Sequence, residues 1–385
     1  MEHGLIPIIA MRNWGELGNL LAAKTLARCL ARHSEFQPEV HEAENFFPRF
    51  LEFGEEIRRI IKSPETVDTR RHGYLSLMDE VGQLFYPGFE DDERVAEPLA
   101  RELDSLVDFL RQARPSTIIG TKEVISRLLM AAARQAELPV QVVNYITNEG
   151  LLRLQVHRSR SLEHHLVAFE SGRRYLINDH DYLPHQVHAV GRLITPADEA
   201  SIVENPDQSG GTIAKLGSTD FRVLIFSNRG GSAYLEPLRL IGSRNRDVSV
   251  LFIGYNDRQL VNEAKELQQH LGIEDMQVVE HLGHGEYVQS VRWLSEAKYP
   301  VLVSKTGPNT MLEAAYFGVP QLLLKSGLPA EDWVGRFVEE HGFGLGFEDM
   351  SALAVAFSKW LDDPGEIVRH RHSARQFAEG LLDPS

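Results

Sequence analysis

The sequence predicts an α/β protein made of two doubly wound domains, each with a parallel sheet covered by helices on both faces. Short apolar runs typical of buried strands alternate with longer helical patterns along the chain, and such alternation favours parallel sheets. A stretch rich in Gly, Pro, Ser and Asn, residues 204–220, interrupts this series, as expected of a linker. A chain of 385 residues is long enough to bury two separate cores.

The first half of the chain opens with a predicted strand at residues 5–10 and an amphipathic helix at residues 20–32. Apolar, β-branched runs then predict strands at residues 117–120, 140–146, 166–169 and 187–191, with a helix at 124–136. Residues 44–113 are less regular and carry aromatic runs at 46–53 and 84–89. These aromatic residues either cover the sheet or line a pocket.

The second half repeats the same plan. Strands are predicted at residues 221–226, 248–253, 276–279, 301–303 and 321–324, and helices at about 233–243, 257–271, 285–297, 308–317 and 330–340. We therefore place an N-terminal domain at residues 1–205 and a C-terminal domain at residues 218–364. The last helical segment, residues 365–385, is available to pack back on the N-terminal domain.

The composition argues against several classes of partner. With 40 basic and 55 acidic side chains the net charge is −15, which disfavours nucleic acid and stable docking on an anionic membrane. The single cysteine, Cys29, lies in an apolar helical pattern, so we interpret it as a small buried hydrophobe. One cysteine cannot form an internal disulfide, which fits a reducing compartment. No apolar run is long enough to span a bilayer, and we expect a cytoplasmic protein.

The segment from residue 301 to residue 320 carries the clearest chemical signal. A buried strand enters a Gly-Pro turn, and a helix begins immediately at Pro308, where the missing N–H costs nothing. The N–H groups of this turn and the helix dipole favour an anion, most often a phosphate. One turn further on, the carboxylate of Glu313 could accept two hydrogen bonds from a vicinal diol such as a ribose. Gly318 ends the helix and Pro320 leads into the next strand.

The whole string from Ser304 to Pro320 resembles the donor site of the glycosyltransferases typified by the peptidoglycan lipid II-forming enzyme and monogalactosyldiacylglycerol synthase. Residues 227–232, 330–334 and 341–344 are similar to further motifs of this family, and residues 142–150 and 188–191 to two of its N-domain strands. The resemblance implies the GT-B architecture, with two Rossmann-like domains facing a cleft. It also implies an inverting reaction with no metal and no cofactor, the UDP-sugar being a co-substrate.

The resemblance assigns roles to residues by position. It implies diphosphate contacts from Gly307, Pro308, Asn309 and Thr310, and donor binding also from Lys305 and Thr306; residues 305–310 are called the donor turn below. It implies approach to the phosphates from the other side by Gly230, Gly231 and Ser232, and backbone recognition of uracil by the turn of His281 and Leu282. It implies that Glu313 binds the ribose and that Glu331 and Asp332 hold sugar hydroxyls. The glycines suit close backbone approach, and a carboxylate pair suits a polyol.

Two departures from the family leave alternatives open. The family usually has glycine at the position of Arg229, which here could neutralise the diphosphate, pair with an acidic sugar, or be a solvated surface arginine. The family's N-terminal histidine is also absent, so the candidates for the general base are Glu16, Glu149 and His157. Their structural alternatives are a helix cap for Glu16, a solvated carboxylate for Glu149, and surface packing for His157.

The expected activity is a metal-independent, inverting transfer of a sugar from a UDP-sugar to a small-molecule acceptor. The acceptor could be a nucleoside, a natural product or a lipid. Retaining GT-B enzymes pair two glutamates seven residues apart, and Thr306 stands seven residues before Glu313, which favours the inverting class. Two alternatives are a UDP-sugar 2-epimerase of the same architecture and a non-catalytic nucleotide-sugar-binding protein.

Overall fold

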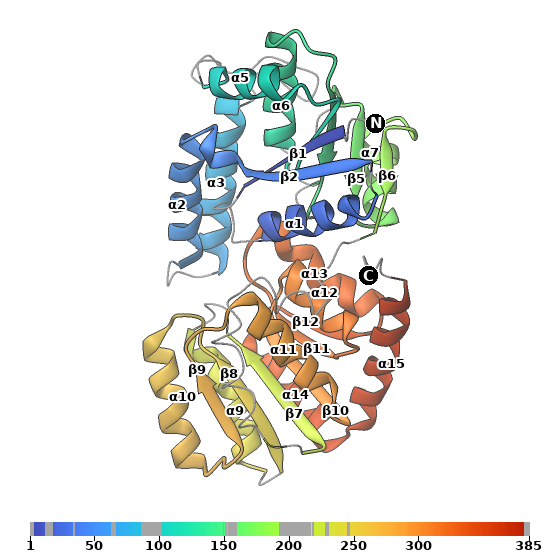
Figure 1. Cartoon of the computed structure of the whole chain (residues 1–385). Coiled ribbons are helices and arrows are strands. Elements are labelled where there is room, and N and C mark those ends of the chain that lie inside the picture. The colour runs from blue at the N-terminus through green and yellow to red at the C-terminus, as the bar shows by residue number, and fades with distance from the viewer. Residues whose placement is uncertain are drawn as a thin grey trace. The chain divides into compact units, whose positions relative to one another are not determined.

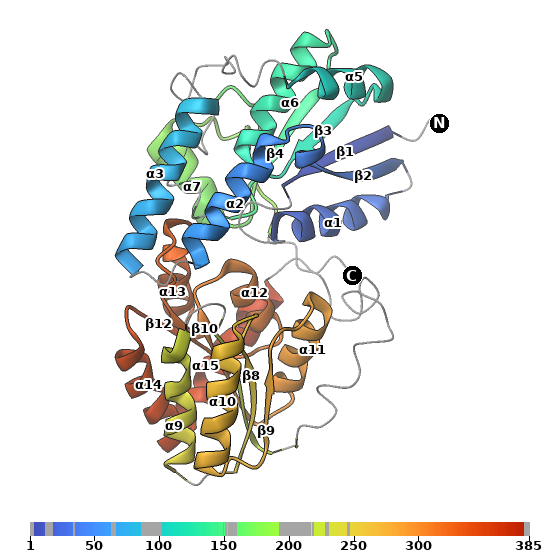
Figure 2. The same ribbon diagram turned by 90° about the vertical axis from the view of Figure 1, so that its left-hand side faces the viewer.

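The computed structural model describes residues 4–11, 18–33, 35–62, 67–85, 102–148, 150, 152, 160–191, 217, 219–227, 231–244 and 247–380. The chain divides into two compact units, unit 1 with residues 1–194 and 382–385, and unit 2 with residues 195–381. Each unit contains a six-stranded sheet, and the paired strands of both sheets run parallel (Figures 1 and 2). Among the described helices, none is both long and apolar enough to cross a membrane. The predicted doubly wound α/β class is confirmed.

The sheet of unit 1 has the strand order β2-β1-β3-β4-β5-β6. Its strands are β1 (Gly4–Ala10), β2 (Phe36–Glu42), β3 (Thr117–Gly120), β4 (Gln141–Tyr145), β5 (His164–Val167) and β6 (Val187–Ala189). Its helices are α1 (Gly18–Ala31), η1 (Ala43–Asn45), α2 (Arg49–Lys62), α3 (Val67–Phe85), α5 (Asp104–Ala113), α6 (Glu123–Gln135) and α7 (Glu170–His180). All five strands predicted for this half are present, and β2 is an additional one. Cys29, expected to be buried, is partly exposed on α1.

The described parts of residues 44–113, the region whose sequence is less regular, are mostly helical and comprise α2, α3 and α5. Helices α2 and α3 pack side by side (Figures 1 and 2). Phe47 and Phe50, from the first aromatic run, are fully buried. For these two rings, burial favours a role in core packing and not the lining of a pocket. The second aromatic run, residues 84–89, lies mostly outside the described residues.

The sheet of unit 2 has the strand order β12-β11-β10-β7-β8-β9. Its strands are β7 (Phe221–Phe226), β8 (Val248–Ile253), β9 (Met276–Val279), β10 (Tyr299–Lys305), β11 (Gln321–Leu324) and β12 (Gly344–Phe347). Its helices are η5 (Gly231–Leu235), α9 (Glu236–Gly242), α10 (Arg258–Leu271), α11 (His284–Ser295), α12 (Pro308–Tyr316), η6 (Pro329–Glu331), α13 (Asp332–Glu340), α14 (Met350–Asp362) and α15 (Gly365–Glu379). The five strands and five helices predicted for this half are all present, and β12 is an additional strand.

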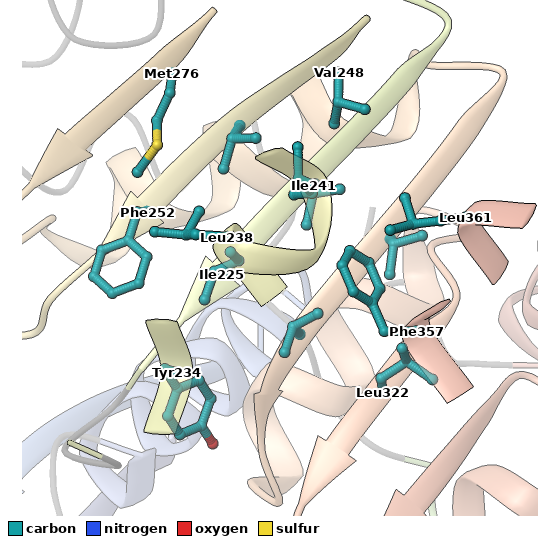
Figure 3. Close-up of a cluster of buried hydrophobic side chains, with 14 of the residues drawn as sticks. Ile225, Tyr234, Leu238, Ile241, Val248, Phe252, Met276, Leu322, Phe357 and Leu361 are labelled. Carbon is teal, nitrogen blue, oxygen red and sulfur yellow. The ribbon is translucent and has the colours of Figure 1, made fainter. Parts of the chain in front are cut away.

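Alternate residues of the central strands of unit 2 belong to two separate hydrophobic clusters, one on each face of the sheet. Val223 and Ile225 of β7 belong to a cluster that includes side chains of α9, α10 and α14. Figure 3 shows part of this cluster, with Leu238 of α9 and Phe357 of α14 above the strands. Leu224 of β7 belongs to the cluster on the other face, with α11 and α12. Since both faces are buried, these strands are rigid supports for the turns at their carboxyl ends.

Helix α15 packs on unit 2. Arg371 donates a hydrogen bond to the carbonyl oxygen of Ser295 at 2.7 Å, and His370 Nδ1 lies 2.7 Å from the carbonyl oxygen of Gly342. The ring of Phe377 lies 4.9 Å from that of Phe343, measured between centroids. The described part of the segment 365–385, for which the sequence left packing on the N-terminal domain open, therefore contacts the C-terminal sheet and its helices.

Helix α13 lies against strand β12 at a contact made by backbone alone. A Cβ atom added at Gly346 of β12 would come within 2.7 Å of Cα of Gly335 on α13, and one added at Gly335 within 3.3 Å of Cα of Gly346. A side chain at position 346 would force helix and strand apart, and one at position 335 would require a smaller adjustment. This glycine contact therefore sets the distance between α13 and the sheet.

The variant Gly346→Ala should reduce the free energy of unfolding by about 2 kcal/mol, because the added methyl group meets backbone atoms that cannot rotate away. Urea unfolding followed by circular dichroism measures the loss. Gly380→Ala is the matched control, since its Cβ atom would meet only Phe377 O at 3.4 Å. Equal stability of the two variants would contradict the assignment of a tight α13–β12 contact.

Candidate functional site

The carboxyl end of β10 leads directly into a helix N-terminus. Gly307 is the N-cap residue of α12 and provides no side-chain cap, and Pro308 occupies the first helical position. The amide of Met311 donates to the carbonyl oxygen of Gly307 at 2.9 Å, so the helix starts without a loop. The positive end of the α12 dipole is therefore presented at the carboxyl edge of the sheet, where doubly wound domains bind their ligands.

Thr306 joins this turn to the loop after β11. Its amide donates to the carbonyl oxygen of Leu324 at 2.8 Å, and its hydroxyl accepts a hydrogen bond from the amide of Ser326 at 3.1 Å. Ser326 Oγ in turn accepts from the amide of Leu328 at 3.1 Å. Thr306 is only 3% exposed, so it acts as a structural anchor of the donor turn.

Lys305 and Glu331 form an ion pair beside the same turn. Lys305 Nζ lies 2.9 Å from each carboxylate oxygen of Glu331, and the side chains are 13% and 14% exposed. Glu331 ends η6 and Asp332 begins α13, so both proposed sugar contacts lie at the junction of these helices. Lys305 therefore takes one hydrogen-bond acceptor position on each Glu331 carboxylate oxygen.

Glu313 projects from α12 toward the first residue of α11. Its Oε1 accepts a hydrogen bond from His284 Nε2 at 2.8 Å, and the two side chains are 12% and 18% exposed. Tyr287, one turn along α11, is buried, and burial reinforced by the charge of Glu313 raises the pKa of its hydroxyl well above 10. Glu313 is therefore held in a small, partly buried polar group at the interface of α11 and α12.

The turn after β9, predicted to read a base, adjoins two residues with unusual backbone. Tyr255 and Asn256 follow β8 with φ angles of 51° and 66°, a left-handed conformation that is uncommon outside glycine. Asn256 Nδ2 lies 3.4 Å from His281 Nδ1, and the Tyr255 ring lies 5.9 Å from the His281 ring. Leu282 is buried in the core, whereas His281 is exposed, so the turn presents its backbone and one ring.

The loop after β7 is described only in part. Arg229 and Gly230 lie outside the described residues, so their predicted roles stay predictions. Gly231 starts η5 with a φ angle of 69°, and Ser232 is exposed. Ser227, at the end of β7, is fully buried, and within the described chain its hydroxyl has no hydrogen-bond partner. A buried hydroxyl in this position is costly unless a ligand or water satisfies it.

All three candidates for the general base, Glu16, Glu149 and His157, lie outside the described residues of unit 1. Among the described residues, unit 1 contains a polar cluster formed by Glu123 and Ser126 of α6, Asn144 of β4 and His165 of β5. Asn144 Nδ2 donates to Glu123 Oε2 at 2.6 Å and lies 3.3 Å from His165 Nδ1, while Asn144 Oδ1 accepts from Ser126 at 2.9 Å. Since His165 Nε2 faces the carbonyl oxygen of Leu162 at 3.2 Å, the neutral tautomer with Nε2–H satisfies both contacts.

Lys122 lies beside this polar cluster, immediately after β3. It is 5% exposed, and burial lowers its pKa from 10.5 to about 7, while the nearby carboxylate of Glu44 acts in the opposite direction. A lysine of this kind exchanges its proton near neutral pH. Sequence reasoning missed Lys122, and the only available signal was a lysine between a predicted strand and a predicted helix.

The structure thus brings the donor turn, Glu313 and Glu331 to the carboxyl edge of one sheet. It adds His284, Tyr255 and Ser326, which the sequence did not single out as site residues. The adjacency of His284 and Glu313 could not be inferred from spacing, because the residues are 29 positions apart on different helices.

The two sheets and their helices define the GT-B architecture, and comparisons with solved structures support this class. No family model and no curated sequence matches the chain. MurG from Acinetobacter baumannii is similar over 99% of this chain and 96% of its own, with a TM-score of 0.57 and 15% identity. The glycosyltransferase SsfS6 from Streptomyces sp. SF2575 gives a TM-score of 0.54 at 13% identity, covering 99% of this chain and 97% of its own.

An epimerase of the same architecture is similar to the same extent. The UDP-GlcNAc 2-epimerase from Neisseria meningitidis, solved with UDP-GlcNAc bound, covers 99% of this chain and 95% of its own, with a TM-score of 0.60 and 13% identity. At such identities the likeness concerns the fold. The predicted resemblance to the GT-B glycosyltransferases is confirmed at that level, and the reaction is not decided by it.

Proposed function

We propose that this protein is a glycosyltransferase that transfers a sugar from a UDP-sugar to a small-molecule acceptor with inversion. The observation that carries the proposal is the donor turn, where an N-terminal helix dipole, a side-chain-free N-cap at Gly307 and the carboxylate of Glu313 meet at one sheet edge. This combination offers an anion site beside a carboxylate that suits a ribose diol. It therefore fits a nucleoside diphosphate.

In the proposed reaction, the acceptor hydroxyl attacks the anomeric carbon as the bond from that carbon to the diphosphate oxygen breaks. The amide groups at the start of α12 stabilise the negative charge that develops on the leaving diphosphate. Glu331 and Asp332 are proposed to orient the sugar, with Lys305 fixing the Glu331 carboxylate. We propose that unit 1 binds the acceptor and supplies the base, and that no metal ion takes part.

A 2-epimerase acting on a UDP-sugar is the second candidate, favoured by the likeness to the Neisseria meningitidis epimerase. Such an enzyme would use the same nucleotide site. It differs in needing acid and base groups at C2 of the sugar and no acceptor. A non-catalytic nucleotide-sugar-binding protein would share the site and turn over nothing.

A screen of nucleotides and nucleotide sugars tests the proposal. UDP at 100 times its dissociation constant should stabilise the protein by about 2.7 kcal/mol, seen as a rise in melting temperature, and ADP and GDP should have much smaller effects. Incubation with UDP-GlcNAc alone, followed by proton NMR, then separates the enzyme classes. Appearance of the C2 epimer without an acceptor would reject the transferase in favour of the epimerase, and the absence of any UDP effect would reject both.

A further inference from the structure

The contact between His284 and Glu313 lies entirely within unit 2. The histidine is the first residue of α11 and the glutamate lies in the middle of α12. Their 2.8 Å contact joins Nε2 of the imidazole to Oε1 of the carboxylate, and fewer than one fifth of either side chain is exposed. The pair therefore forms away from bulk water, where a charge-assisted hydrogen bond is stronger than at the surface.

We propose that His284 is a positioning residue that holds the Glu313 carboxylate in the orientation needed to receive the ribose diol of a uridine nucleotide. The inference rests on the proposed function and deepens it, because it assigns selectivity for the ribose hydroxyls to a pair of residues. His284 acts through Glu313 and does not itself contact the nucleotide.

The support of the imidazole comes from its own helix terminus. The amide of Gly283 donates to Glu286 Oε2 at 3.0 Å, and the amide of Tyr287 donates to the carbonyl oxygen of Gly283 at 2.9 Å. These bonds close the first turn of α11 around His284. Tyr287 is packed in the core with Phe226, at a ring distance of 5.1 Å. The position of His284 is thus determined by the core and not by solvent.

The geometry divides the work of the carboxylate. Oε1 is bound to His284, so Oε2 is the second acceptor that the carboxylate can offer to a ligand. An unrestrained glutamate side chain loses rotamer entropy when it binds a ligand, and a carboxylate already held in place avoids most of that loss. His284 therefore increases the affinity for a ligand that binds Glu313. It leaves unchanged the affinity for a ligand that lacks the matching hydroxyl group.

Calorimetric titration with UDP and 2′-deoxy-UDP tests the inference on the full-length protein. The wild type should bind UDP about tenfold more tightly than 2′-deoxy-UDP. In His284→Ala the dissociation constant for UDP should rise about fivefold while that for 2′-deoxy-UDP changes by less than twofold. His284→Gln, which retains an N–H donor, should recover most of the UDP affinity. His270→Ala, an exposed position on α10, is the matched control and should behave as wild type.

The possible outcomes separate this inference from the proposed function. If His284→Ala weakened UDP and 2′-deoxy-UDP equally, the histidine would serve only packing of α11 on α12, and the inference would be wrong. Unchanged UDP affinity in His284→Ala would also overturn it, while leaving the proposed function intact. If the wild type bound no uridine nucleotide, both the function and the role of His284 would fall.

Discussion

Replacing Glu313 with alanine should weaken UDP binding by about 10- to 100-fold, because a hydrogen bond to a charged, partly buried group contributes about 1.5–3 kcal/mol. Glu313 is 12% exposed and lies one turn from the α12 N-terminus, so its loss removes the group proposed to accept the ribose hydroxyls. Isothermal titration with UDP measures the change. Inorganic pyrophosphate, which has no ribose, should bind the variant and the wild type alike.

The matched control for this prediction is Glu266→Ala on α10. That carboxylate is exposed and belongs to the same unit, so the variant makes the same change in net charge at a distance from the turn. UDP affinity should stay within twofold of wild type there. If Glu313→Ala bound UDP as well as Glu266→Ala does, the placement of the nucleotide at this turn would be wrong.

Raising the pH from 7 to 9 should stabilise the wild type by about 2 kcal/mol relative to Lys122→Met. Burial lowers the folded-state pKa of Lys122 to about 7, against 10.5 in the unfolded chain. Between these values the unfolded chain binds more protons than the folded one, so the free energy of unfolding rises with pH, by at most about 1.36 kcal/mol per pH unit. Above about pH 10.5 the two states are equally deprotonated and the gain ends.

Urea unfolding of both proteins at pH 7, 8 and 9, followed by circular dichroism, gives this difference. Methionine preserves the length of the side chain and cannot titrate. The variant also removes the cation near Glu44, so the comparison uses the difference in slope between the two curves and not their separation. Parallel curves across the range would show that the amine of Lys122 is not desolvated in the folded protein.

The strands of both sheets were predictable where they are buried on both faces. Residues 221–226 and 248–253 form near-continuous apolar runs, interrupted only by Arg222 and Ser249, because helices cover both sides of β7 and β8. Strand β2 was not predicted from the sequence because it is an edge strand. Its sequence contains several polar residues and Pro38, which weaken the strand signal. Strand β12 escaped because two of its four residues are glycines, which local propensity counts against a strand.

The donor turn was predictable because its signal is local. Strand, Gly-Pro turn and helix follow one another without interruption, and the preferences of glycine and proline act within a few residues. The two ion pairs beside this turn could not be predicted from the sequence. Lys305 contacts Glu331, and His284 contacts Glu313, only once the sheet and its helices have assembled. The family resemblance predicted that Glu331 contacts a sugar. The ion pair between Glu331 and Lys305 is known only from the structure.

The glycine contact between α13 and β12 also bears on how this site could diversify in evolution. Gly335 and Gly346 touch through backbone, so a larger residue at position 346 would push the start of α13, and with it the neighbouring Glu331, away from the sheet. Under the proposed function, a change of sugar preference that leaves this helix in place would come from replacing the side chains at positions 331 and 332.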